Sequence, residues 1–64
     1  MTETEILQEV NDMITEELPD EYHAEWNRQS KADNLRRCKF VADGITTVSK
    51  MAYTFQLHCD HKRR

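Results

Sequence analysis

The residue types that bind metals best are gathered near the end of the chain, where His58, Cys59 and His61 lie within four positions. Together with Cys38 and His23 they offer the sulfur and nitrogen ligands that zinc prefers. Their spacing matches no zinc motif, because the sequence contains no Cys-x-x-Cys and no His-x-x-x-His. On one helix Cys38 and Cys59 would lie about 31 Å apart, too far to share an ion. We therefore expect no metal and no cofactor, with the cysteines acting as small core residues.

Basic side chains offer a second kind of chemistry, contact with the phosphates of DNA or RNA. The candidate contact residues are Arg36, Lys39 and Lys50, which would line one face of a helix, and the tail residues Lys62, Arg63 and Arg64. The chain as a whole has a formal net charge of −3, and its acidic front would repel phosphate. A nucleic-acid-associated regulator is therefore the alternative interpretation, and direct nucleic-acid binding is not favoured.

Catalysis has no recognisable basis in this sequence, which lacks a nucleophile with a base at fixed spacing and a glycine-rich loop. A chain of 64 residues also leaves little room for a substrate pocket. The acidic residues between Glu16 and Glu25 could mimic a phosphate backbone or dock on a basic protein, but solubility is the simpler explanation for them. We expect a protein that is not an enzyme.

Charge is divided along the chain in a way that favours association. Residues 1–27 hold nine Asp or Glu and no Lys or Arg, whereas residues 28–64 hold all nine Lys or Arg and three Asp. The two parts carry formal charges of −9 and +6 and can attract each other within one chain or between two copies. A domain of this size buries only about 60% of its unfolded surface and often relies on oligomerisation.

The sequence gives no sign of export or of a membrane span. Its acidic start is unlike the basic and apolar start of a signal peptide. No apolar run approaches the roughly 20 residues that a membrane helix needs. We expect a cytoplasmic protein with no membrane partner.

Helical segments are expected, because one glycine and one proline cannot supply the turns of an all-β fold. Residues 3–18 should form an amphipathic helix whose apolar side chains share an arc of about 140°. Pro19 ends it, since the residue before a proline avoids the helical region. Residues 20–28 should form a short connecting helix, in which Trp26 fills the core between the two longer elements.

Residues 30–59 are expected to form one long helix, begun by Ser30 and Asp33 in a Ser-x-x-acid cap. Apolar residues between Cys38 and Cys59 share an arc of about 160°, with Gly44 inside it. An α+β fold with a C-terminal hairpin or meander is the alternative, because Asp43-Gly44 is a hairpin signal and residues 51–59 alternate in polarity. We expect an all-α fold, a single domain over residues 1–64.

The apolar arc of this long helix is wider than the first helix can cover, and exposed apolar patches usually mark association. The expected partner is a second copy, because two-fold dimers dominate soluble oligomers. The residues expected in the core or the dimer interface are Ile6, Val10, Met13, Ile14, Leu18, Trp26, Phe40, Val41, Ile45, Val48, Met51, Ala52 and Phe55.

Two runs, MTETEILQEVNDMITEELPDEYHAEWN and RRCKFVADGITTVSKMAYTFQLHCD, resemble the small early proteins that lambdoid phages encode between their exonuclease and excisionase genes. The resemblance covers most of the chain and transfers no functional residue. It implies a non-enzymatic accessory protein that tips development toward the lytic path and disturbs the host cell cycle. With the residue patterns, it predicts a regulatory protein that binds a host or phage protein in the host cytoplasm.

Overall fold

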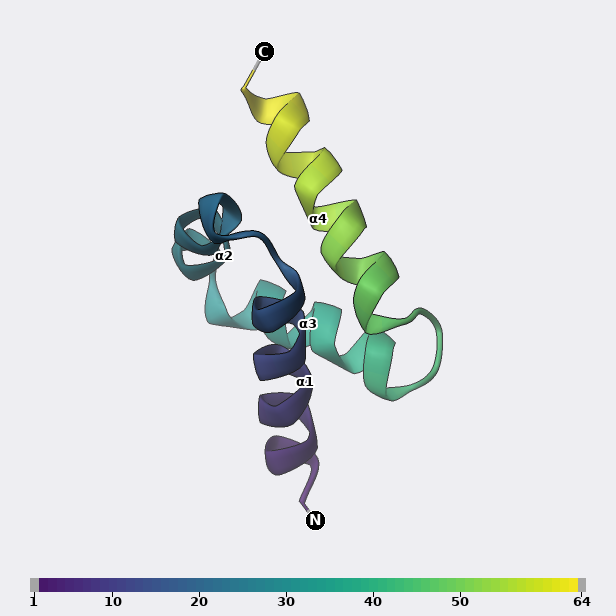
Figure 1. Cartoon of the computed structure of the whole chain (residues 1–64). Helices are drawn as coiled ribbons and strands as arrows, with labels where there is room; N and C mark the ends of the chain where they lie inside the picture. Colours follow the sequence, from purple (N-terminus) through teal and green to yellow (C-terminus); the bar gives the residue numbers. More distant parts are fainter. Residues whose placement is uncertain (1, 64) are drawn as a thin grey trace.

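A computed structural model describes residues 2–63, which form four α-helices and one 3-10 turn (Figure 1). The elements in chain order are α1 (Glu3–Glu17), η1 (Asp20–Tyr22), α2 (His23–Arg28), α3 (Lys31–Ala42) and α4 (Val48–Lys62). No strand occurs between residues 2 and 63. The all-α prediction is therefore confirmed, and the alternative with a C-terminal hairpin is wrong.

The first helix begins at Glu3 as predicted and ends at Glu17, one residue before the predicted end at Leu18. The Thr2 hydroxyl accepts a hydrogen bond from the Glu5 backbone N–H at 3.3 Å, which caps the start of α1. Leu18 is already extended, with φ −68° and ψ 133°, because Pro19 follows it. The chain then turns through η1 into α2, which together make the expected connecting segment.

The long helix predicted over residues 30–59 is wrong, because α3 ends at Ala42 and α4 begins only at Val48. Gly44 has a φ of +79°, a left-handed conformation that glycine adopts at little cost. The Gly44 N–H bonds to the Val41 carbonyl at 3.0 Å, and the Ile45 N–H bonds to the Phe40 carbonyl at 2.9 Å. These two bonds define a Schellman cap, the common way for a helix to end at glycine.

Side-chain caps begin both helices of the second half. The Ser30 hydroxyl accepts a hydrogen bond from the Asp33 N–H at 3.1 Å, as the sequence predicts. The Thr47 hydroxyl accepts one from the Lys50 N–H at 3.1 Å and starts α4. The Asp43-Gly44 turn signal was thus real, but the turn joins two helices instead of two strands.

The break lets α4 fold back, so that α1 packs against both α3 and α4 (Figure 1). The molecule measures 40 × 20 × 18 Å, and α1 begins and α4 ends at opposite ends of it. The rings of Trp26 and Phe55 meet edge to face, with centroids 5.2 Å apart at 86°. Trp26 is only 2% exposed, so it fills the core as predicted.

Most of the predicted core residues are buried inside the chain. The buried core consists of Val10, Ile14, Leu18, Tyr22, Trp26, Cys38, Met51, Ala52, Phe55 and Cys59. Leu7, Val41 and Val48 pack against it from partly exposed positions. Ile6, Met13, Phe40 and Ile45 remain exposed at the surface. Folding back therefore buries much of the apolar arc within one chain and leaves a smaller apolar surface for a partner.

Replacing Phe55 by aspartate should unfold the protein. Removing a buried phenylalanine side chain costs about 3–5 kcal/mol, and a buried unpaired carboxylate adds to that cost. The exposed Lys50→Glu variant, on the same helix, should melt within a few degrees of the parent. Circular dichroism with thermal melting measures both. A cooperative transition for Phe55→Asp near the parent temperature would contradict this placement of the core.

Candidate functional site

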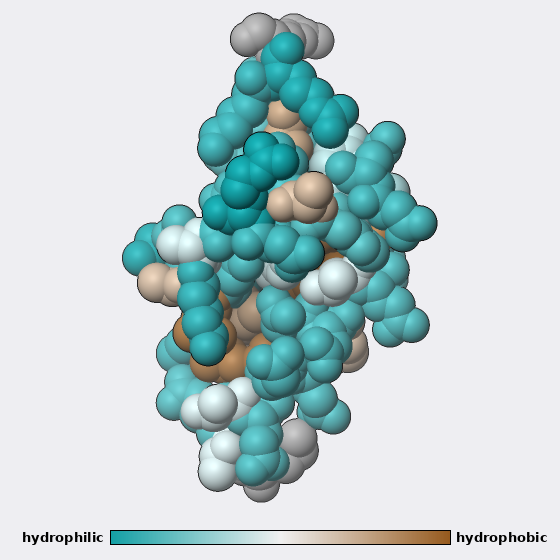
Figure 2. Space-filling view, turned by 90° about the vertical axis from the view of Figure 1, so that its left-hand side faces the viewer, coloured by the Kyte–Doolittle hydropathy of each residue, from teal (hydrophilic) through white to brown (hydrophobic). Residues whose placement is uncertain are grey.

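Apolar side chains reach the surface in the half of the molecule where α1 begins, and Figure 2 shows a patch of them on an otherwise largely hydrophilic face. In the same half, α1, α3 and the loop after α3 enclose a groove of about 390 Å³, which we call the apolar groove. Its lining is Leu7 from α1, Ala32, Leu35, Arg36, Lys39 and Phe40 from α3, and Asp43 and Ile45 from the loop. The lining thus combines five apolar side chains with three charged ones, Arg36, Lys39 and Asp43.

The Schellman cap explains why two large apolar side chains of the groove lining, Phe40 and Ile45, are exposed. The Ile45 N–H binds the Phe40 carbonyl in this cap. Residues paired in this way in a Schellman motif commonly pack their side chains together when both are apolar. Ile45 is 70% exposed and Phe40 42% exposed, although both are strongly apolar. Leu35 adds a third exposed apolar side chain to the lining. A contiguous exposed apolar surface of this kind is typical of an association site.

Two charged residues of the groove, Lys39 and Asp43, are held by ion pairs within the chain. The Lys39 ammonium lies 3.4 Å from an Asp43 carboxylate oxygen and 3.4 Å from one of Glu3. The hydrogen bonds to Asp43 and Glu3 raise the pKa of Lys39 above its ordinary value. These pairs are exposed and stabilise the fold only slightly, but they tie α1 to the end of α3. Lys39 is thereby engaged, and it is less suited to the phosphate contact predicted for it.

The predicted basic stripe is divided by the break in the helix. Arg36 and Lys39 lie on α3, whereas Lys50 lies in the first turn of α4. Lys62 and Arg63 lie at the other end of α4, about 18 Å from Lys50 along the axis. The last candidate, Arg64, is outside the described residues. The five predicted contacts within the described residues therefore do not form one row.

A different basic surface arises from the fold. One depression is lined by Glu25, Arg28, Gln29, Cys59, Lys62 and Arg63. A second is lined by Gln29, Asp33, Arg36, Arg37, Phe40 and His58. Gln29 lines both, so the two depressions adjoin. Sequence reasoning did not place Arg28, Arg37 and His58 on one basic surface, because they come together only through tertiary packing.

The metal-ligand candidates are separated by their environments. Cys38 and Cys59 are both buried in the core, and burial raises the pKa of each thiol above its ordinary value. A ring nitrogen of His23 lies 2.9 Å from the Leu18 carbonyl oxygen, whereas His58 and His61 are at the surface. Within residues 2–63, no three His, Cys, Asp or Glu side chains come close enough to hold one ion.

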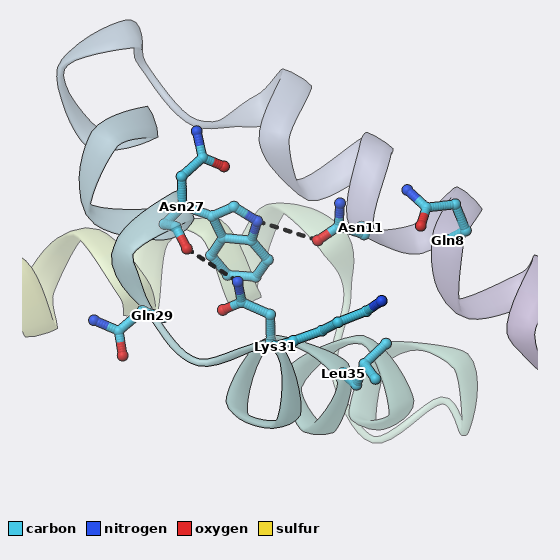
Figure 3. Close-up of a pocket in the computed structure, with 8 residues that line it drawn as sticks. Gln8, Asn11, Asn27, Gln29, Lys31 and Leu35 are labelled. Atoms are coloured by element: carbon cyan, nitrogen blue, oxygen red, sulfur yellow. Dashed lines mark hydrogen bonds between the residues drawn. The ribbon is translucent and has the colours of Figure 1, made fainter.

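A polar depression of about 230 Å³ lies beside Trp26 (Figure 3). Its walls are Gln8, Asn11, Trp26, Asn27, Gln29, Lys31, Asn34 and Leu35. The Trp26 indole N–H donates to the Asn11 side-chain oxygen at 3.1 Å, and the Asn34 amide donates to the Trp26 carbonyl at 3.0 Å. The Trp26 ring is buried and cannot stack on a ligand, so these amides serve to fix α2 between α1 and α3.

Comparison with known proteins adds no family to these observations. The sequence matches no protein-family model and shows no significant similarity to a curated protein or to a solved structure. None of the helices in the described part of the chain is long and apolar enough to span a bilayer. The apolar groove and the basic depressions are the surfaces of this protein that are suited to contact a partner.

Replacing Asn11 by alanine removes the hydrogen-bond partner of the Trp26 indole N–H. Leaving a buried donor unsatisfied costs about 1–3 kcal/mol, so the free energy of unfolding should fall by that amount. Gln8→Ala is the matched control, since Gln8 lines the same depression from the same helix and bonds only to the exposed Asp12. Urea unfolding measures both variants. Equal stabilities for the two would show that the indole hydrogen bond contributes nothing.

Proposed function

We propose that this protein is a small non-enzymatic regulator that acts by protein–protein contact, with the apolar groove as its contact surface. The observation that carries the proposal is the exposure of Phe40 and Ile45, side by side at the end of α3. The contact that Ile45 makes with Phe40 in the Schellman cap leaves the Ile45 side chain 70% exposed, and Ile45 lies outside the core cluster. An apolar side chain kept in water is explained when a partner covers it.

The partner that we propose for the groove is a second copy of the chain. The lining carries two cations, Arg36 and Lys39, and one anion, Asp43. Across a two-fold axis the same patch meets itself, so the Arg36 guanidinium of one copy can face the Asp43 carboxylate of the other. A chain of 64 residues also has little stability to spare, and dimerisation is a common remedy.

The biological role follows from the resemblance of the sequence to early accessory proteins of lambdoid phages. A regulator of that kind would act in the host cytoplasm, through a phage or host protein, on phage development or on host processes. The fold suits such a role, since a compact helical chain with exposed apolar residues can present a binding face without catalytic machinery. The alternative role, contact with nucleic acid, draws on the basic depressions instead of the groove.

Replacing Ile45 by aspartate tests the groove. Burial of an isoleucine side chain contributes roughly 1.5–3 kcal/mol, and both copies lose it, so the dimer dissociation constant should rise at least about tenfold. The variant should keep its helical content, because Ile45 is 70% exposed. Sedimentation equilibrium across micromolar concentrations measures the association.

Tyr53→Asp is the control, since Tyr53 is 61% exposed on α4 and does not line the groove. It should dimerise like the parent. A parent that stays monomeric at high micromolar concentration would refute the dimer. Equal weakening by Tyr53→Asp and Ile45→Asp would place the contact elsewhere on the surface.

A further inference from the structure

The two adjoining depressions form one surface, which we call the basic face: Arg28, Arg36, Arg37, His58, Lys62 and Arg63. The face is drawn from the end of α2, the middle of α3 and the last turns of α4. On an unbroken helix Arg37 and His58 would lie about 31 Å apart, yet here they line the same depression. The break at Gly44 therefore assembles the face.

The basic face keeps an excess of positive charge after its internal pairs are counted. Arg28 pairs with Glu25 at 3.1 Å, and Arg36 lies 4.0 Å from Asp33. No carboxylate of residues 2–63 forms an ion pair with the other three cations of the face, which are Arg37, Lys62 and Arg63. The two depressions together are lined by five Arg or Lys side chains and by only two acidic ones, Glu25 and Asp33.

Two of these cations are positioned by aromatic rings. The Arg37 guanidinium lies 5.3 Å from the centre of the Phe55 ring, and the Arg63 guanidinium lies 5.6 Å from that of Tyr22. Cation–π contacts of this length hold the side chain without neutralising its charge. The Tyr22 hydroxyl is itself fixed by a 2.9 Å hydrogen bond to Asp60. Arg37 and Arg63 are therefore held in place while their N–H groups stay available.

The acidic residues of the chain lie mainly elsewhere. Helix α1 carries six Asp or Glu and no Lys or Arg, and none of its residues lines either basic depression. The net charge of −3 thus describes the whole molecule and not this face. Separation of this kind lets a protein that is acidic overall attract an anion to one side.

We propose that the basic face binds the phosphate backbone of duplex DNA without reading its sequence. Two adjoining cationic depressions suit a ligand whose charges repeat along a chain, and arginine pairs with phosphate through two N–H groups at once. The acidic α1 limits the strength of binding, so the affinity belongs in the micromolar range of nonspecific complexes. The basic face includes Arg28, Arg37 and His58, which were not among the six predicted contacts. It excludes Lys39 and Lys50, which were.

The test is fluorescence anisotropy of a labelled random-sequence 20-base-pair duplex, titrated with the full chain between 50 and 200 mM salt. Lys62→Glu should weaken binding several-fold at 50 mM salt and lower the salt slope by about one phosphate contact. Lys50→Glu is the matched control, because it makes the same charge change on the same helix but lies outside both depressions. It should bind like the parent.

Arg37→Gln provides a second variant, in the other depression, and should also weaken binding and reduce the salt slope. Thermal melting of each variant confirms that it is folded. Absence of binding by the parent at 50 mM salt would overturn the proposal. Equal losses for Lys62→Glu and Lys50→Glu would also overturn it, since net charge alone would then govern binding. So would displacement of the DNA by an equal charge concentration of polyglutamate, which would point to an acidic protein as the ligand.

Discussion

The left-handed backbone at Gly44 ends α3 and turns the chain so that α4 can pack against α1. Without that turn, the apolar residues of the second half would lie along one rod and could not enclose a core. With it, Phe55 reaches the edge of Trp26, and both are buried. The same turn creates the exposed Phe40–Ile45 pair and brings His58 to the arginines of α3. Core, groove and basic face therefore share one structural cause.

Trp26 links the local segments into this arrangement. It sits on a helix of six residues, too short to be stable alone. Its ring packs on α4, its indole N–H bonds to Asn11 of α1, and its carbonyl accepts from Asn34 of α3. One residue thus contacts all three longer helices, two of them through its side chain and α3 through its backbone carbonyl. The apolar groove and the basic face keep their shapes only while these three helices stay in register.

The sequence predicted the elements that local signals define and missed those that depend on tertiary folding. Thr2, Pro19 and Ser30 act within a few residues, so the starts of α1 and α3 and the end of α1 were predictable. The end of α3 was not, because the helical apolar period continues through Gly44 and hides the break. The basic face could not be predicted for another reason: Arg37 and His58 are 21 positions apart in the sequence and line the same depression only because the chain folds back.

The break at Gly44 can be tested most directly by nuclear magnetic resonance in solution. Backbone chemical shifts should be helical over residues 31–42 and 48–62 and should lose helical character over residues 43–47. Nuclear Overhauser contacts should join the ring protons of Trp26 and Phe55. Unbroken helical shifts from residue 31 to residue 62, with no contact between those rings, would contradict the fold and both surfaces that depend on it.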